Sequence, residues 1–243
     1  MASILSTKVL DQAAKNHLLN AGLGFTEYDA IGIEFLPVNL NVPSTQRFTH
    51  MVFTSKNGFR SFYQAFERLE KAERPFWNLP VYCVGETTAA RITDDGFEVQ
   101  AMFPNAGELA DFLTVEKGLS LAYFKGNRSL PTLAEKLQSA HIPHREFLSY
   151  QTVLKPKSFD RSFAGVLFFS PSGVESHCTN NKMNQTIAFC IGHTTASAAS
   201  KFTDHIKIAP KPTTSQLILQ AIKHFKTSPY TSCLLYTSDA ADD

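Results

Sequence analysis

The sequence lacks the features by which several functional classes are recognised. Its 243 residues include 23 basic and 22 acidic side chains, so the formal net charge is only +1. A nucleic-acid or membrane-surface binder usually carries a strong positive patch, and this balance argues against one. Neither G-x-x-x-x-G-K-[ST] nor G-x-G-x-x-G occurs, so no nucleotide phosphate loop is predicted.

Long apolar runs are also missing. No segment approaches the roughly 20 apolar residues that span a bilayer. The apolar run at the N-terminus is too short for a secretory signal. We therefore expect a cytoplasmic protein with no nucleic-acid or membrane partner.

Cysteine and histidine patterns are sparse. The four cysteines lie far apart, at Cys83, Cys178, Cys190 and Cys233, with no C-x-x-C pair. This spacing favours free thiols in a reducing compartment. His141 and His144 have the spacing of a metal pair, but Pro143 disrupts a helical display and further ligands are missing nearby. We expect loop histidines and no metal site.

Short β-rich runs alternate with helical patterns along the chain. Strands separated by helix-length segments predict βαβ units and parallel sheets. Several runs, such as LAYF at 121–124 and VLFF at 166–169, are continuously apolar, as expected when helices cover both faces of a sheet. Phe59, Phe62 and Phe66 fall on one helical face. The predicted fold class is α/β.

Part of the chain occurs twice. MVFTSKNGFRSF at 51–62 resembles VLFFSPSGVESH at 166–177, and VYCVGETTAARI at 81–92 resembles FCIGHTTASAAS at 189–200. A third pair follows, 101–113 beside 207–222. The period is far longer than the roughly 20–50 residues of stacked repeats, so a half-molecule is duplicated. The first strand, ILST at 4–7, has no clear counterpart.

This asymmetry predicts a discontinuous domain. Residues 1–36 and 155–227 would form one α/β domain, and residues 37–154 an inserted second one. The crossings, near 34–38 and 150–154, are extended and apolar, so they could pair as a two-stranded linker with the role of a hinge. Residues 228–243 lack the preceding periodicity, and we expect a disordered or non-native tail.

The duplicated turns are the candidate ligand-binding segments. FTSKNG, VGETTA, FFSPSG and IGHTTA each join a strand to a helix, placing four helix N-termini at the carboxyl edges of two parallel sheets. Such ends present unpaired N–H groups that bind anions, at the edge where α/β proteins bind ligands. Any single turn is most simply a helix cap. Four in duplicate order indicate a cleft of neutral donors between two facing domains, without naming its ligand.

Three other features are ambiguous. The segment Lys125-Gly126-Asn127-Arg128 follows a strand and could place a cation and an amide at the same edge, or be a solvated loop. His193 could contact a carboxylate or simply form its turn. Tyr150 lies on a predicted crossing strand, where its phenol would face the cleft or be half-buried, a common use of that ring.

These motifs together resemble the uroporphyrinogen-III synthase family. The resemblance covers about residues 3 to 226 and is carried by FTSKNG, YCVGETTA, FKGNR, YQTV, FFSPSG and IGHTTA. It implies two α/β domains joined by a two-stranded linker. The implied enzyme is a cofactor-free, monomeric hydro-lyase that cyclises hydroxymethylbilane to uroporphyrinogen III, with inversion of ring D and loss of water. The substrate's eight carboxylates suit a cleft of helix ends and hydroxyls.

The resemblance also implies roles for individual residues. Tyr150 would be catalytic, assisting departure of the hydroxyl. The substrate-binding residues would be Ser170, Ser172, Gly173, Thr194 and Thr195 from one domain, and Thr54, Ser55, Asn57, Thr88, Lys125 and Asn127 from the other. The chain departs from the family at STK, residues 6–8, where many members have a threonine-arginine-proline turn. Lys8 could substitute there.

Two other functions remain open. A hinge-closing protein that binds a polyanionic small molecule without transforming it would share the same architecture. The absence of an export signal counts against it. A phosphosugar or nucleotide enzyme is less well supported, because a phosphate loop and a recognisable base are missing.

Overall fold

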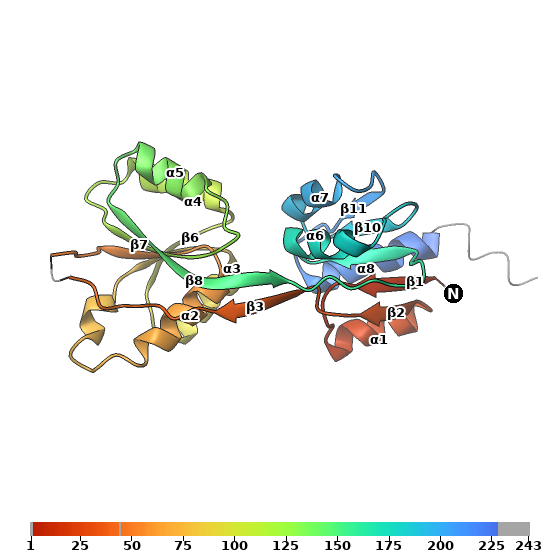
Figure 1. Cartoon of the computed structure of the whole chain (residues 1–243), viewed down its shortest axis with the longest axis horizontal. Coiled ribbons are helices and arrows are strands. Elements are labelled where there is room, and N and C mark those ends of the chain that lie inside the picture. The colour runs from red at the N-terminus through yellow and green to blue at the C-terminus, as the bar shows by residue number, and fades with distance from the viewer. Residues whose placement is uncertain (1, 44, 228–243) are drawn as a thin grey trace, which may run out of the picture. The chain divides into compact units, whose positions relative to one another are not determined.

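The computed structural model describes residues 2–43 and 45–227, which fall into two compact units (Figure 1). The first unit is built from the chain up to Gly32 and from Val153 onward, and the second from Ile33–Thr152. These divisions lie a few residues before the predicted boundaries at 36/37 and 154/155. Those boundaries, as limits of independent domains, stay predictions. The predicted tail, 228–243, lies outside the described residues.

The first unit is a five-stranded parallel sheet with helices on both faces. The strands are ordered β11-β10-β9-β1-β2. Adjacent residues point to opposite faces, as the strand period requires: Ile4 packs with α1 and α8, and Leu5 with α6 and α7. The elements are β1 (Ser3–Ser6), α1 (Gln12–Asn20), β2 (Gly24–Glu27), β9 (Gly165–Phe168), α6 (Pro171–Asn180), β10 (Ile187–Cys190), α7 (His193–Ala199), β11 (Ile206–Ile208) and α8 (Thr214–Thr227).

The second unit has a six-stranded sheet in the order β3-β8-β7-β4-β5-β6. From β8 to β6 every pairing is parallel. The elements are β3 (Ile31–Phe35), β4 (His50–Phe53), α2 (Lys56–Phe66), the 3-10 helix η1 (Arg74–Trp77), β5 (Val81–Val84), α3 (Glu86–Asp94), β6 (Val99–Phe103), α4 (Ala106–Val115), β7 (Leu121–Gly126), α5 (Thr132–Ser139) and β8 (His144–Leu154).

Aromatic side chains fill one side of the second sheet. Phe53, Phe124 and Phe147 stack across three strands, with ring centroids 5.0 and 4.7 Å apart, and α2 packs against them. On the other face, Val52 and Tyr123 pack against α4 and α5. Both sheets are therefore covered on two faces, and the predicted α/β class with flanked parallel sheets is confirmed.

The two units repeat one topology with a permuted chain order. Reading β11-β10-β9-β1-β2 against β6-β5-β4-β7-β8 makes β7 the counterpart of β1. The close approach of the equivalent glycines Gly58 and Gly173 to these strands agrees. A Cβ on Gly58 would lie 2.9 Å from Phe124 O on β7, and one on Gly173 would lie 3.4 Å from Thr7 Oγ1, just after β1. The first strand thus has a counterpart, but it follows the duplicated segment in the other unit instead of preceding it.

β3 and β8 pair in antiparallel fashion. Leu36 N donates to Ser149 O at 3.0 Å and Lys155 N to Ala30 O at 2.8 Å, so residue numbers fall in one strand as they rise in the other. The chain passes between the units within these two strands. Their role as a hinge stays a prediction.

A buried histidine in the first unit predicts acid sensitivity. His177 is 3% exposed, and burial lowers the pKa of its imidazole from 6.5 to about 4. Between these values the unfolded chain binds a proton that the folded chain does not, so the free energy of unfolding should fall as the pH drops from about 6.5 to about 4. One pKa unit corresponds to about 1.4 kcal/mol, so the loss is on the order of a few kcal/mol.

Urea unfolding across this pH range checks the prediction. His177→Gln should flatten the dependence, whereas His205→Gln, at an exposed histidine, should retain it. Equal slopes for both variants would contradict the prediction.

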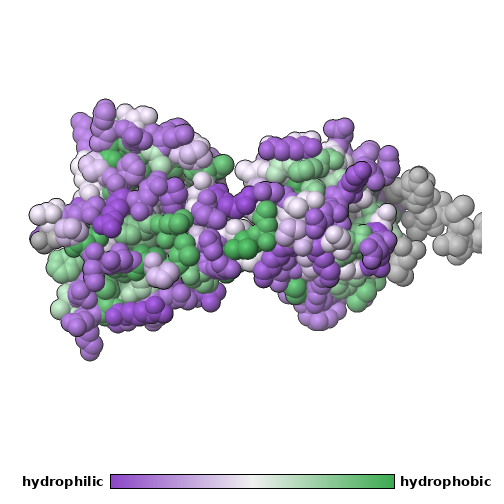
Figure 2. All heavy atoms as spheres, viewed as in Figure 1, coloured by the Kyte–Doolittle hydropathy of each residue, from purple (hydrophilic) through white to green (hydrophobic). Residues whose placement is uncertain are grey.

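No helix in the described part of the chain is both long and apolar enough to cross a membrane. On the face shown in Figure 2, hydrophilic residues predominate and hydrophobic ones form separate patches.

Candidate functional site

The first turn at the carboxyl edge of the second unit joins β4 to α2. Ser55 has extended backbone angles and caps the helix, its Oγ accepting a hydrogen bond from Asn57 N at 3.2 Å. Thr54 Oγ1 lies 3.4 Å from the hydroxyl of Tyr123 on β7. The turn thus brings the predicted Thr54, Ser55 and Asn57 to one place beside the end of β7.

The second turn joins β5 to α3. Gly85 has a φ of 85°, a left-handed conformation that favours glycine, and α3 begins at the next residue without a side-chain cap. Thr88 lies at this edge as predicted, but its side chain is only 4% exposed and its N–H donates to Gly85 O. The neighbouring Thr87 is exposed. The turn therefore presents Thr87 to solvent and packs Thr88 inside the unit.

Lys125 and Asn127 lie at the end of β7 and already have partners. Lys125 Nζ forms an ion pair with Glu146 Oε2 at 2.9 Å. Asn127 Oδ1 accepts from Thr152 N at 2.9 Å, and Asn127 N donates to Tyr150 O at 3.2 Å. Asn127 therefore joins the end of β7 to β8 at Tyr150 and Thr152, and fixes the backbone position of Tyr150.

The Tyr150 ring lies directly over Gly126. The two residues are register partners on β8 and β7, where the register shifts by a residue. A Cβ on Gly126 would lie 2.5 Å from Cζ and 2.8 Å from the hydroxyl oxygen of Tyr150, closer than real Cβ contacts. Ser129 Oγ accepts from Gly126 N at 3.1 Å. A glycine is required here for the half-buried phenol to occupy this place.

The first unit presents a similar edge. Ser170 Oγ caps α6 by accepting from Gly173 N at 3.1 Å, and Ser172 in the same turn is half-buried. α7 follows β10 without a side-chain cap, with Thr194 exposed and Thr195 only 1% exposed. The five predicted residues of this unit thus share one edge, where Thr194 presents its side chain and Thr195 packs inside.

Lys8 is the register counterpart of Lys125. Leu167 on β9 and Val52 on β4 are equivalent residues of the duplicated segment. Leu167 pairs with Ser6, and Val52 pairs with Tyr123. Lys8 and Lys125 each follow these partners by two residues. The side chain of Lys8 is exposed, with Nζ 5.7 Å from the centroid of the Phe169 ring. The structure therefore places a cation at the carboxyl edge of each unit.

Sequence reasoning missed four contributors: Gly126, Tyr123, Glu146 and the exposed Thr87. Burial raises the pKa of Tyr123, so its phenol stays protonated beside Thr54. Glu146 forms the ion pair with Lys125 and lies four residues before Tyr150 on the same strand. Glu146 is the register partner of Tyr123, and the register shift before Tyr150 means that the period of two does not relate the faces of Glu146 and Tyr150. The contact between Gly126 and Tyr150 had no signal beyond the glycine in FKGNR.

The cap in the first unit gives a stability prediction. Ser170→Ala removes the side-chain acceptor of Gly173 N, so the free energy of unfolding should fall by about 1 kcal/mol in urea. Ser172→Ala is the matched control: among the described residues Ser172 makes no side-chain hydrogen bond, so it should change stability little. An equal loss in both variants would contradict the capping role.

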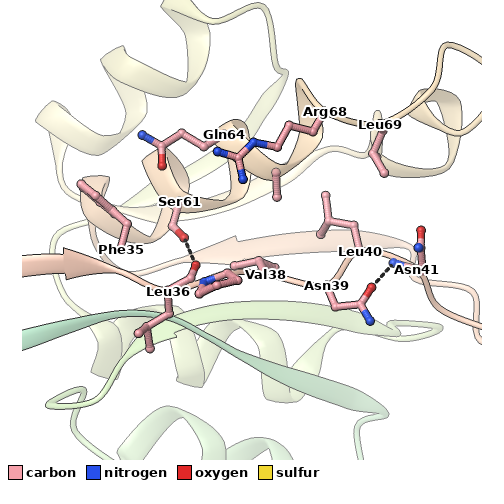
Figure 3. Close-up of a pocket in the computed structure, with 12 residues that line it drawn as sticks. Phe35, Leu36, Val38, Asn39, Leu40, Asn41, Ser61, Gln64, Arg68 and Leu69 are labelled. Carbon is pink, nitrogen blue, oxygen red and sulfur yellow. Dashed lines mark hydrogen bonds between the residues drawn. The ribbon is translucent and has the colours of Figure 1, made fainter.

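A pocket of about 290 Å³ lies elsewhere on the second unit, between the segment after β3 and α2 (Figure 3). Its lining includes Arg68, Gln64 and Asn39, but none of the predicted site residues. Ser61 Oγ donates to Leu36 O across it at 3.2 Å, so part of its polar lining is already satisfied. It is separate from the carboxyl edge. No group of three His, Cys, Asp or Glu side chains suited to a metal occurs within 2–43 and 45–227.

Comparison with known proteins agrees with this architecture. The crystal structure of uroporphyrinogen-III synthetase from Helicobacter pylori is similar at 20% identity and a TM-score of 0.69, over 92% of this chain and 100% of that one. A mutant uroporphyrinogen III synthase from the extremely thermophilic bacterium Thermus thermophilus is similar at 16% identity and a TM-score of 0.67, over 92% and 98%. These likenesses show the fold.

The family comparison goes further. The family described as uroporphyrinogen-III synthase HemD matches residues 13–219, most of the chain and both carboxyl edges. The chain therefore belongs to the uroporphyrinogen-III synthase family, lyases of tetrapyrrole biosynthesis that cyclise hydroxymethylbilane to uroporphyrinogen III.

Proposed function

We propose that the carboxyl edge of each unit binds carboxylates of hydroxymethylbilane and that the protein cyclises this substrate mainly by positioning its reacting carbons. The observation that carries this proposal is the Tyr150 phenol, fixed over Gly126 at an edge rich in helix N-termini. Helix N-termini bind anions through backbone N–H groups and the helix dipole. A substrate with many carboxylates can thus be bound by a nearly neutral protein.

The exposed and half-buried members of each turn are proposed to make the contacts. In the first unit these are Ser172 and Thr194 with the N–H groups around Gly173, and Lys8 adds a charge. Ser170 shares its hydroxyl with the cap, and Thr195 supports its turn from inside.

The second unit is proposed to work in the same way. Thr54, Ser55 and Asn57 form one contact, and Thr87 forms another with Thr88 packed behind it. Lys125 would exchange its ion pair with Glu146 for a substrate carboxylate. This pair is partly exposed, so breaking it costs little, about 0–1 kcal/mol.

Chemistry begins with loss of the hydroxyl. In the proposed step the Tyr150 phenol transfers its proton to the hydroxyl oxygen as the carbon–oxygen bond breaks, so that the group leaves as water and a phenolate remains. The phenolate takes back a proton when ring D loses its own proton at ring closure. The electron-rich pyrrole supplies the electron pair and an azafulvene cation forms. The substituted carbon of ring D then attacks this cation, giving a spiro intermediate that rearranges with ring D inverted. Holding ring D close to the cation is the main contribution of the protein.

The alternative is a binding protein that closes on a polyanion without transforming it. Feeding hydroxymethylbilane to the purified protein and separating the oxidised porphyrin isomers discriminates the two. Spontaneous closure gives isomer I, and the enzyme should give isomer III. Isomer I alone, with folded protein present, would favour the binding protein.

We further propose a cytoplasmic monomer. Cys83, Cys178 and Cys190 are free thiols, which suits a reducing compartment. Burial raises the pKa of Cys83 to about 11 and that of Cys190 to about 12, so neither is a reactive thiolate. Light scattering across a concentration series tests the monomer: a mass near 27.0 kDa is expected, and twice that value would contradict it.

A further inference from the structure

We propose that the first unit has a second ligand site, a pocket at the amino edge of its sheet that binds a small organic anion. The pocket has a volume of about 690 Å³, within the usual range for small ligands. Most of its lining comes from 159–164 before β9 and from 180–186, which runs from the last residue of α6 toward β10. Ser170 and Gly192 lie at the opposite ends of these strands, so the pocket is distinct from the carboxyl edge.

The lining has a surplus of positive charge and donors. Arg161 and Lys182 outnumber Asp160, the one acidic residue of the lining. Arg161 donates to Thr26 Oγ1 and lies over the Phe163 ring, 4.8 Å from its centroid, which fixes its guanidinium. In the part of the chain that the structure describes, the side chains of Lys182, Asn180, Asn184 and Gln185 make no hydrogen bond. These groups suit an anionic oxygen.

His177 gives the pocket a buried donor. The residue lines the pocket although it is only 3% exposed. Nδ1 lies 3.4 Å from the Tyr28 hydroxyl. Burial raises the pKa of Tyr28 to about 12, so the phenol keeps its proton and can donate to Nδ1, which leaves the imidazole proton on Nε2. Among the described residues no hydrogen bond to Nε2 occurs, so this N–H can donate to a ligand in the pocket.

The pocket walls are held by specific hydrogen bonds. Asn181 Oδ1 accepts from Phe159 N at 3.1 Å, and its Nδ2 donates to Lys157 O at 2.7 Å and His177 O at 2.8 Å. The second of these donor bonds occupies His177 O, a carbonyl oxygen of the last turn of α6 that would otherwise disfavour an anion. Thr186 Oγ1 donates to Phe163 O at 3.0 Å and joins the two segments. Phe159, half-buried in the wall, offers an apolar surface, which favours an organic anion over an inorganic one.

Titration of the ¹⁵N-labelled protein at constant ionic strength tests the site with three probes: benzoate, acetate and inorganic phosphate. Benzoate should shift the His177 ring nitrogens and the amides of Asn184 and Gln185 with a Kd of about 1 mM or below. Acetate should bind about tenfold more weakly, because it lacks the apolar body. The double variant Arg161→Gln/Lys182→Gln should weaken benzoate binding at least about tenfold.

The control is Lys157→Gln, which removes a cation over the Phe159 ring that is not part of the lining, and should leave benzoate binding unchanged. Absence of saturation at about ten times the expected Kd would overturn the site. Equal binding by the double variant would overturn the role of the two cations. Phosphate binding more tightly than benzoate would overturn the organic ligand, and shifts confined to Ser170 and Thr194 would place the anion at the carboxyl edge instead.

Discussion

Tyr150→Phe should lower the rate of isomer III formation by about 100-fold or more, the usual contribution of a positioned proton donor. The substitution removes only the hydroxyl, and the ring can still lie over Gly126. Substrate affinity should change little, because the carboxylates are bound elsewhere, so the loss should appear in kcat. Separation of the porphyrin isomers after timed reactions measures it, and unfolding in urea shows that the fold is intact.

Tyr63→Phe is the matched control. Tyr63 lies on α2, packed against Phe59 and Phe66, and is a partly buried tyrosine like Tyr150. Its variant should form isomer III at the wild-type rate. Unchanged turnover in Tyr150→Phe would remove the phenol from the chemical step and leave positioning alone as the source of catalysis.

Gly126→Ala should reduce kcat by about 100-fold as well, because a displacement of about 1 Å at the reacting centre can have that effect. The added Cβ would lie 2.5 Å from Cζ of Tyr150 and 2.7 Å from Cε2, so the ring must move. The strained packing should also lower the free energy of unfolding by about 1–3 kcal/mol. Kinetics and urea unfolding measure the two effects independently.

A double-mutant cycle separates the contact from the chemistry. In a Tyr150→Ala background the ring is absent, so Gly126→Ala should lose nearly all of its effect on stability. Gly32→Ala is the steric control: its Cβ would also come within 2.8 Å of an atom, but that atom is Cε of the Lys155 side chain, which can move away. A loss of stability that persists without the Tyr150 ring would show that Gly126 has another role.

The architecture could be predicted because it follows from local patterns. A continuously apolar strand such as VLFF, a serine cap and an amphipathic helix determine each strand-turn-helix unit, and the duplication showed which units correspond. Ser55 and Ser170 cap their helices at equivalent positions, as FTSKNG and FFSPSG suggested. The counterpart of β1 escaped detection because β7 follows the duplicated segment, so the two strands are out of order in a linear comparison.

Finer features of the site depend on geometry that the sequence does not show. Two pairs of adjacent threonines lie in the first turns of α3 and α7. The orientation of each helix leaves Thr87 and Thr194 exposed and buries Thr88 and Thr195. The Tyr150 ring meets Gly126 because the register between β7 and β8 shifts between Lys125 and Gly126. An ideal alternation of side chains would not predict that shift.

The central claim is that the carboxyl edges of both units bind the tetrapyrrole. Titration of ¹⁵N-labelled protein with uroporphyrinogen III, kept reduced, tests it most directly. The account predicts amide shifts at 55–58, 86–88, 126–127, 172–173 and 193–195, with the amides of the pocket beside α2, at 36 and 38–41, unchanged. Shifts confined to 36–41, with both edges unchanged, would contradict it.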